Sequence, residues 1–313
     1  MVKAVAISPA GLSSFFEICD EGPDSKPLSD PMRVGARGGG FTVAFPLRTE
    51  VIAEEKSQSS VKVFINGKLA DARTTKSVVE KVLKLAGGKH RVEVHHEVPV
   101  PTGAGFGTSG AGALCTALAL SSALGLKLSY TQIGRIAHSA EVECKTGLGT
   151  VAPLMVGGPC VVTVKPGAPG IAVVERIPVP EKARLVCAVF SSIETRELLL
   201  KAANKAAINS AGREALRRIL EDPCLETFMD SCRKFALKSG LATERTAKLM
   251  ETLAARGLLC AQNMVGEAVH VVARDDEELE EAMSILESFS LGKARTYVAN
   301  LTWSGAKLVE VVE

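Results

Sequence analysis

The chain has 313 residues, of which 46% are hydrophobic and 23% charged; this is enough for two globular domains and excludes a disordered or fibrous protein. Its 37 basic and 35 acidic residues leave a net charge of +2, so we expect no broad surface for nucleic acid or anionic membrane. Any anion must therefore bind in a local pocket. The eight cysteines form no C-x-x-C pair, and no apolar run reaches the ~18 residues of a membrane span, so we expect a cytoplasmic protein. The adjacent His95 and His96 lie in a strand-like segment and point to opposite faces, which argues against a shared metal ion.

The first part of the chain is expected to be mostly sheet. A strand over 2–7 leads into a turn at 8–11, and a polar loop follows over 21–30. The glycine-rich stretch 35–40 contains one cation, Arg37, and predicts a backbone that bends closely around a ligand. Further elements are expected as strands over 41–45, 50–53, 61–65 and 91–98, a hairpin turn at Asn66–Gly67 and a helix over 77–85.

Helices become frequent after the glycine-rich stretch 103–112. A buried helix should reach about residue 124, and a second begins at Ser129, whose hydroxyl caps the first turn while Gln132 returns the bond. Later elements are expected as strands over 185–190, 268–273, 296–301 and 307–312, and as helical regions over 195–256 and 276–288. This mixed order favours an α+β fold, and the Pro/Gly cluster at 165–170 predicts two domains, 1–170 and 171–313.

The segment 99–112, PVPTGAGFGTSGAG, carries the most informative pattern. It lies between an expected strand and an apolar helix. Its glycines let backbone N–H groups converge, and the start of a helix adds partial positive charge, so the segment predicts an anion cradle. Thr108 and Ser109 supply hydroxyls at the mouth of this cradle. The ligand that this combination suggests is a phosphate chain with its metal.

Other interpretations of this segment fit less well. The spacing Gly105-x-Gly107-x-x-Gly110 matches a dinucleotide fingerprint, but the acid expected about 20 residues later is absent. Residues 107–111 approach a nucleophile elbow, with His138 and His270 as candidate bases, yet Ala111 stands where the last glycine should be. Walker A and protein-kinase signatures do not occur. A loop that only allows the helix to pack is the plainest alternative.

Residues 101–111, P-T-G-A-G-F-G-T-S-G-A, resemble the phosphate-binding motif P-x-x-x-G-L-G-S-S-A-A of the GHMP kinases, which phosphorylate small molecules without a Walker A loop. Residues 7–11 resemble the first motif of this family, and residues 147–158 its S-G-x-D…G-G region. Further segments are similar to the archaeal branch that phosphorylates the 4-hydroxyl of pantoate on the way to coenzyme A, namely 8–16, 35–40, 165–170 and 263–269. The resemblance covers most of the chain. It implies a ribosomal protein S5 domain 2-like N-terminal domain that binds ATP, and a ferredoxin-like C-terminal domain that completes the substrate cleft.

The resemblance also implies roles for individual residues. The ATP phosphates would be wrapped by Pro101, Gly103, Ala104, Gly105, Phe106, Gly107, Thr108, Ser109 and Gly110. Ser109 and Glu141 would bind Mg²⁺ and, with Thr150, form the catalytic group. His138 and Thr195 would contact the substrate. The plainer alternatives are a solvated charge for Glu141, a buried core side chain for His138 and a helix cap for Thr195.

Arg37 is assigned by its chemistry rather than by the resemblance. A guanidinium binds a planar carboxylate through two parallel hydrogen bonds, so we hypothesise that Arg37 meets the carboxylate of the substrate. We therefore expect the chain to bind a small hydroxy acid and to bind neither nucleic acid nor a membrane. The chain could also form a homodimer.

Three positions depart from the family pattern. Thr150 stands where GHMP kinases often have an Asp, Ala36 where the pantoate branch usually has Ser, and Val162–Thr163 near an expected Arg. A threonine cannot act as an anionic base near neutral pH. Because phosphoryl transfer depends mainly on positioning and charge neutralisation, one account is an active kinase without that base. The alternatives are another GHMP activity, such as a homoserine, shikimate or mevalonate-type kinase, or a nucleotide-binding protein without turnover.

Overall fold

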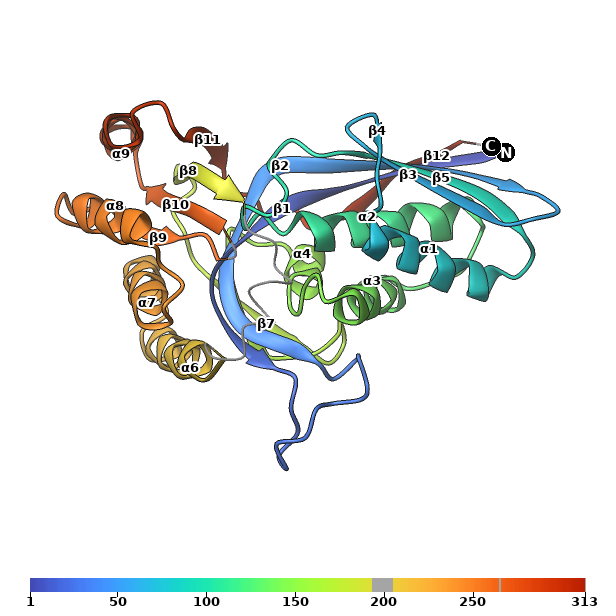
Figure 1. The fold of residues 1–313 in the computed structure, drawn as a ribbon, viewed down its shortest axis with the longest axis horizontal. Coiled ribbons are helices and arrows are strands. Elements are labelled where there is room, and N and C mark those ends of the chain that lie inside the picture. Colours follow the sequence, from blue (N-terminus) through green and yellow to red (C-terminus); the bar gives the residue numbers. More distant parts are fainter. Residues whose placement is uncertain (193–204, 265, 313) are drawn as a thin grey trace.

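The computed structural model describes residues 1–192, 205–264 and 266–312, which form two β-sheets with helices packed against them (Figure 1). The first sheet has the order β12-β1-β2-β5-β3-β4, and a shorter arm, β6-β7, pairs with β2. Its strands are β1 (Val2–Cys19), β2 (Gly35–Glu55), β3 (Ser60–Ile65), β4 (Lys68–Leu69), β5 (His90–Glu97), β6 (Cys160–Lys165), β7 (Val173–Ile177) and β12 (Lys307–Val312). Pairing is antiparallel except between β3 and β5.

The second sheet has the order β11-β8-β10-β9. Its strands are β8 (Arg184–Ser192), β9 (Cys260–Gln262), β10 (Gly266–Ala273) and β11 (Arg295–Asn300). The helices near the first sheet are α1 (Arg73–Ala86), α2 (Thr108–Ala123), α3 (Tyr130–Cys144) and α4 (Val151–Val156). Those near the second are α7 (Leu225–Lys238), α8 (Glu244–Ala254) and α9 (Asp276–Ser290), while α6 (Lys205–Glu221) packs against α7 and against β1 of the first sheet. The α+β expectation is therefore confirmed.

The predicted turn at 8–11 is wrong, and the glycine-rich stretch 35–40 is a strand, of which residues 36–40 line the cavity described below. β1 continues to Cys19 through a bulge that contains Pro9, where a proline removes no ladder hydrogen bond, and residues 35–40 begin β2 as its direct partner. The glycines serve close packing. A Cβ on Gly39 would lie 2.9 Å from the Phe15 and Phe228 rings, and one on Gly40 would collide with the Leu12 carbonyl oxygen. Small residues therefore let the second half of the chain pack directly onto this strand pair.

Other local expectations are confirmed. Asn66 and Gly67 both have positive φ, 49° and 77°, and join β3 to β4 as the dipeptide predicts. Ser129 and Gln132 form a capping box at the start of α3. α2 is buried on nearly all sides, which explains why its sequence is apolar without helical periodicity. The long helical region expected over 195–256 is, within the described residues, α6, α7 and α8.

The domain boundary near residue 170 stays a prediction, and strands from both sides of it belong to the first sheet. β7 and β12 both lie beyond that residue, yet they belong to the first sheet. β12 pairs with β1, so the two ends of the chain lie side by side (Figure 1). The chain therefore leaves the first sheet after β7, builds the second, and returns with its last strand.

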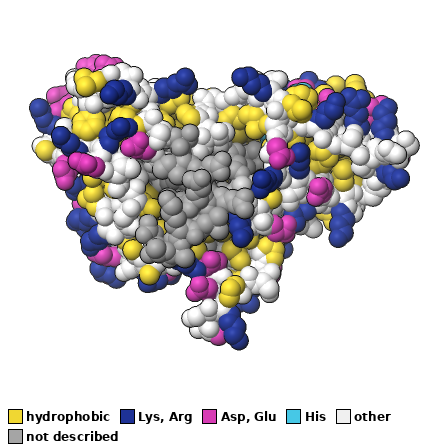
Figure 2. Space-filling model, in the orientation of Figure 1, with side chains coloured by type: hydrophobic (Ala, Val, Ile, Leu, Met, Phe, Trp, Pro, Cys, Tyr) yellow, Lys and Arg dark blue, Asp and Glu magenta, His cyan; other side chains and the backbone are white. Residues whose placement is uncertain are grey.

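The surface agrees with the near-neutral charge. On the face drawn in Figure 2, side chains of both signs are interspersed, and no single basic stripe appears among the coloured residues. Within the described residues, no helix combines the length and the apolarity that crossing a bilayer requires.

Candidate active site

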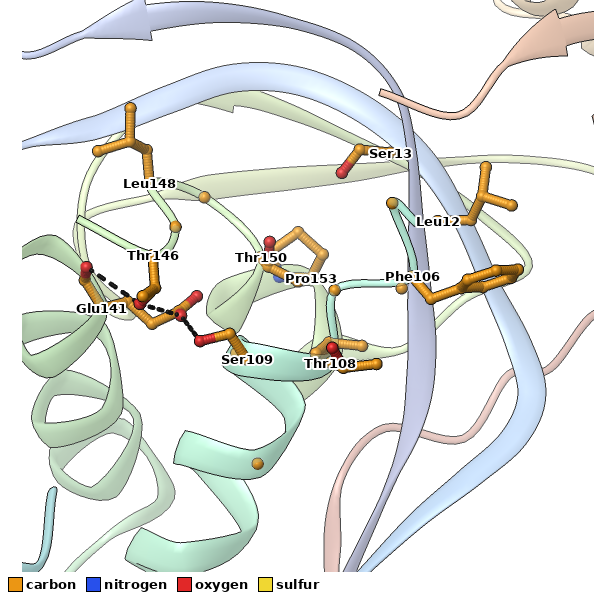
Figure 3. A pocket seen from close by; sticks show the side chains of 18 of the residues that line it. Leu12, Ser13, Phe106, Thr108, Ser109, Glu141, Thr146, Leu148, Thr150 and Pro153 are labelled. Carbon is orange, nitrogen blue, oxygen red and sulfur yellow. Dashed lines mark hydrogen bonds between the residues drawn. The ribbon is translucent and has the colours of Figure 1, made fainter. Parts of the chain in front are cut away.

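A cavity of about 760 Å³ opens between the first turn of α2, the bulged middle of β1 and β2, and the loop that leads into α4 (Figure 3). Its volume suits a nucleotide-sized or drug-sized ligand. One arm is lined by the glycine loop before α2, and another reaches Ala36, Arg37 and Thr163. The site therefore joins residues that are far apart in the sequence.

The glycine loop is held in an unusual backbone conformation. Gly103, Gly105 and Gly107 all have left-handed φ values, 75°, 79° and 60°. β1 fixes the loop from one side, since the Gly11 N–H donates to the Phe106 carbonyl at 3.0 Å and the Ser13 N–H to the Gly105 carbonyl at 3.4 Å. Gly107 precedes α2, and no described side chain caps that helix start. The first N–H groups of α2 are therefore presented to an anion in the cavity.

Ser109 and Glu141, the two residues proposed for Mg²⁺, lie together in the cavity. The Ser109 hydroxyl donates to Glu141 Oε1 at 2.6 Å, and the hydroxyl of Thr146 donates to the same oxygen at 2.9 Å (Figure 3). Glu141 is 2% exposed. Burial raises the pKa of its carboxyl above the ordinary value, and the two hydroxyl hydrogen bonds oppose that rise in part. Oε2 accepts no hydrogen bond from the part of the chain that the structure describes.

These donors fit Mg²⁺. A hydroxyl and a carboxylate are the hard oxygen ligands that Mg²⁺ takes, and it usually binds through one or two protein groups together with phosphate oxygens. Glu141 Oε2 is oriented toward two glycines, because a Cβ on Gly110 would lie 2.9 Å from it and one on Gly147 would collide with it. The described residues contain no cluster of three His, Cys, Asp or Glu side chains that could hold a metal alone. A magnesium site here therefore depends on the phosphates of a bound nucleotide.

Thr150 lies across the loop from Ser109, just before α4. Its Cγ2 packs against Gly107 and Gly11, at 2.7 Å and 3.4 Å from where their Cβ atoms would be. Although it occupies the N-cap position, its hydroxyl does not cap α4 within the described structure. Thr150 lines the cavity, so this hydroxyl is available to a ligand.

The second arm of the cavity is lined by residues of β2 and β6. Gly38 pairs with Thr163, and Ala36 lies beside Gly149, 3.2 Å from where a Cβ on that glycine would be. Arg37 lines the cavity there, and its guanidinium also donates to Glu17. The structure thus gathers Thr150, Ala36 and Thr163, three positions of the family departures, around one space.

Some predicted residues do not line this cavity. Of the predicted nucleotide residues, Pro101 and Ala104 are outside the described lining, and Ala104 is fully buried. His138 is also buried, with Nε2 2.9 Å from the Val34 carbonyl oxygen, and burial lowers its pKa. The plainer alternative of a core histidine therefore describes its position. Thr195 lies outside the described residues.

The nucleophile-elbow alternative finds no base. His270 is fully buried, and its ring nitrogens lie 2.9 Å from Asn263 Oδ1 and 3.3 Å from Ser14 Oγ. Burial lowers its pKa to about 3. The hydroxyl of Ser109 is directed to a carboxylate instead of an imidazole. Within the described structure, the site thus lacks the Ser–His pair that acyl transfer requires.

Sequence reasoning missed Thr146 and the far end of the cavity. Thr146 belongs to no motif, and its place depends on the left-handed Lys145, which turns the chain back toward Glu141 after α3. The far end lies between β5 and α1, where His96 has both ring nitrogens bonded, to Thr49 at 2.8 Å and to Thr75 at 3.0 Å. Burial lowers the pKa of His96 to about 4, so it is neutral at physiological pH.

Comparison with known proteins identifies a family and relatives to which this chain is similar. A model of the GHMP kinases N terminal domain matches residues 73–158, which include the glycine loop, Glu141 and Thr150. A pantoate kinase of Thermococcus kodakarensis is 33% identical over 295 residues, 91% of this chain and 92% of that one. A pantoate kinase of Methanocaldococcus jannaschii is 30% identical over 281 residues, 90% of this chain and 96% of that one.

The fold has a solved counterpart. A structure described as a phosphotransferase related to the CoA biosynthesis pathway superposes with a TM-score of 0.85, at 27% identity and with 99% of both chains covered. The family resemblance expected from residues 101–111 is therefore confirmed. The roles of single site residues stay predictions.

Proposed function

The chain belongs to the pantoate kinases of the GHMP kinase family, and from this premise we propose that it transfers the γ-phosphoryl group of ATP to the 4-hydroxyl of pantoate, giving 4-phosphopantoate and ADP on the way to coenzyme A. One observation supports this most directly. The predicted phosphate loop, the Ser109–Glu141 pair and a cationic arm open into one cavity. That arrangement has room for a nucleotide and a small acid side by side.

In this proposal the chain binds the nucleotide mainly through its backbone. The N–H groups of the glycine loop and of the first turn of α2 hold the phosphate oxygens. Ser109 Oγ and Glu141 Oε2 would hold Mg²⁺, which when bound neutralises charge on those oxygens. The end between β5 and α1 is lined by the apolar Ile65, Ala72 and Val98 and by polar residues, namely Asp71, Arg73, Thr74, Thr75 and His96, and this mixture suits a nucleoside. The backbone dipoles account for polyanion binding by a chain with a net charge of only +2.

The acceptor would lie in the arm near Arg37 and Thr150. Its hydroxyl oxygen attacks the γ-phosphorus, the bond from that phosphorus to the bridging oxygen breaks, and ADP leaves. In a loose transition state the hydroxyl keeps its proton until late, so the proton can pass to a phosphoryl oxygen without a protein base. Thr150 then acts by orienting the hydroxyl through a hydrogen bond. This is how the site can work without the Asp that many relatives have.

Replacing Thr150 with Val tests this role. The change removes the hydroxyl but keeps the shape that packs against Gly11 and Gly107. We expect kcat to fall about tenfold, the effect of one lost hydrogen bond, while the KM for ATP changes little. Thr150→Ser, which keeps the hydroxyl, should retain most of the activity. Steady-state kinetics with both substrates measures this, and an unchanged kcat in Thr150→Val would exclude the role.

The proposed activity itself is tested by ADP release over a panel of hydroxy acids that includes pantoate, homoserine, shikimate and mevalonate. Release with pantoate supports the proposal, and release with another acid alone would reassign the substrate. ATP binding with no release for any acid would favour a nucleotide-binding protein without turnover.

We also propose the cytoplasm as the compartment, because it supplies ATP and keeps free cysteines reduced.

A further inference from the structure

A carboxylate is held between two arginines at the edge of the substrate arm. Glu17 lies on β1, directly opposite Arg37 on β2, and its side chain is 8% exposed. Arg37 donates from Nε and Nη2 to Glu17 Oε2, at 2.7 Å and 2.5 Å. Arg213, on α6, donates from Nη1 to Oε1 at 3.1 Å. Of these three side chains, Arg37 is the one among the described lining residues of the cavity.

The charges of this cluster do not cancel. Two guanidinium cations face one carboxylate, so one positive charge remains. Arg213 shares Glu17, and for that reason Glu17 does not fully neutralise Arg37. Since the Arg37 side chain is 34% exposed and lines the cavity, the remaining charge acts where a ligand can reach it. Without Arg213, the Glu17–Arg37 pair would be neutral and would attract an anion only weakly.

The hydrogen bonds also fix which edge of Arg37 is left free of Glu17. Glu17 takes the side edge of the guanidinium, formed by Nε and Nη2. The end edge, formed by Nη1 and the second Nη2 hydrogen, donates to no oxygen within the described structure, and the Cys19 thiol is a further described group beside the guanidinium. Two parallel N–H groups on that edge match the two oxygens of a carboxylate. Glu17 therefore orients the guanidinium as well as lowering its net charge.

The geometry points to a three-residue receptor in which Arg37 binds the carboxylate of the substrate, and Glu17 and Arg213 are positioning residues that set its orientation and charge. This inference rests on the proposed function, because it takes a hydroxy acid to be the ligand of this arm. It makes a residue of α6, which lies beyond residue 170 in the chain and packs against α7 and β1, part of substrate recognition.

A purely structural role for Arg213 is the competing explanation, since α6 packs on the end of β1. That packing has other anchors. The Asn209 side chain accepts from the Ile18 N–H at 2.8 Å and donates to the Ile18 carbonyl at 3.0 Å, and Lys205 pairs with Asp20 at 2.6 Å. Losing Arg213 should therefore leave α6 in place. A charge role and a docking role consequently predict different results when Glu17 is removed as well.

The test combines two substitutions in the full chain and measures the Kd of pantoate by calorimetry and its KM by kinetics. We expect Arg213→Ala to raise both about three- to tenfold, as for one partly screened charge near an anion, with the KM for ATP unchanged. Arg213→Lys should restore most of the affinity. In the double variant Glu17→Gln/Arg213→Ala, Arg37 is no longer neutralised, and the affinity should recover toward that of the wild type.

The control is Arg217→Ala, one turn further along α6, where the arginine pairs only with Glu221 at the surface among described residues. It should change neither constant. Unchanged pantoate affinity in Arg213→Ala, or no recovery in the double variant, would overturn the receptor. If pantoate binds as expected but is never phosphorylated, the proposed function fails and the receptor stands. If wild-type protein does not bind pantoate, both fail.

Discussion

Glu141→Gln is expected to lower kcat by about 100- to 1,000-fold, the usual loss when one electrostatic stabiliser of a transition state is removed. Gln keeps the size of the side chain and can still accept from Ser109 and Thr146, which donate to Glu141 at 2.6 Å and 2.9 Å. It loses the negative charge that would hold Mg²⁺. The remaining activity should need a higher Mg²⁺ concentration, which a titration of rate against Mg²⁺ at saturating ATP measures.

Glu143→Gln is the matched control, because Glu143 lies two residues further on the same helix and pairs with Lys81 at 2.8 Å near the surface. We expect its kcat and Mg²⁺ dependence to stay close to those of the wild type. Equal losses in both variants would show that the helix, and not the carboxylate of Glu141, carries the effect.

The stability of Glu141→Gln separates lost chemistry from lost folding. Burial raises the pKa of Glu141 in the folded chain, so between the ordinary value of 4.5 and the raised one the folded state holds more protons than the unfolded state. The stability of the metal-free wild type must therefore fall as the pH rises through that window. Gln does not titrate, so the variant should have an equal or higher Tm above the window. A lower Tm would mean that the carboxylate supports the fold instead.

Gly107→Ala should lower kcat/KM for ATP about 100-fold, because displacing a phosphate-binding backbone by even 1 Å has an effect of this order. Gly107 has φ +60°, which costs an L-residue ~1–2 kcal/mol. A Cβ there would also lie 2.7 Å from both the Gly11 carbonyl oxygen and Thr150 Cγ2. The loop must therefore shift away from β1 and from the start of α4. Steady-state kinetics and ATP binding by calorimetry measure the loss.

Gly125→Ala is the control for backbone strain alone. Gly125 follows the other end of α2 with nearly the same φ, +66°, but no atom of the described structure lies within 4 Å of its Cβ position. Gly125→Ala should lower the Tm, because its backbone strain is comparable to that of Gly107→Ala, and it should leave the KM for ATP unchanged. If Gly107→Ala behaved like Gly125→Ala, the glycine loop would not be the phosphate site.

Features that depend only on neighbouring residues could be predicted from the sequence. The Asn66–Gly67 hairpin and the Ser129 capping box each follow from residues within one turn, and both are present. The glycine loop before α2 is also local, since its spacing and the helix that follows determine it together. Ser109 and Glu141 are 32 residues apart, and they were singled out together through the family resemblance rather than by any local rule.

Features that depend on distant partners could not be predicted. Residues 35–40 are too rich in glycine to indicate a strand, and only their pairing with β1 and the approach of Phe228 make them one. β12 joins β1 from the other end of the chain, which no local pattern indicates. No sequence pattern distinguishes Glu17 from an ordinary surface acid. Its burial and its two arginine partners appear only when β1, β2 and α6 meet.

The activity proposed for this chain is phosphorylation of pantoate at its 4-hydroxyl. The direct test is ³¹P NMR of the product formed from pantoate, ATP and Mg²⁺ by the full chain, with the Glu141→Gln variant as the blank. We expect a new phosphomonoester signal coupled to the protons of the C4 methylene, growing in step with ADP and absent from the blank. No phosphomonoester, or one coupled to the single proton at C2, would contradict it.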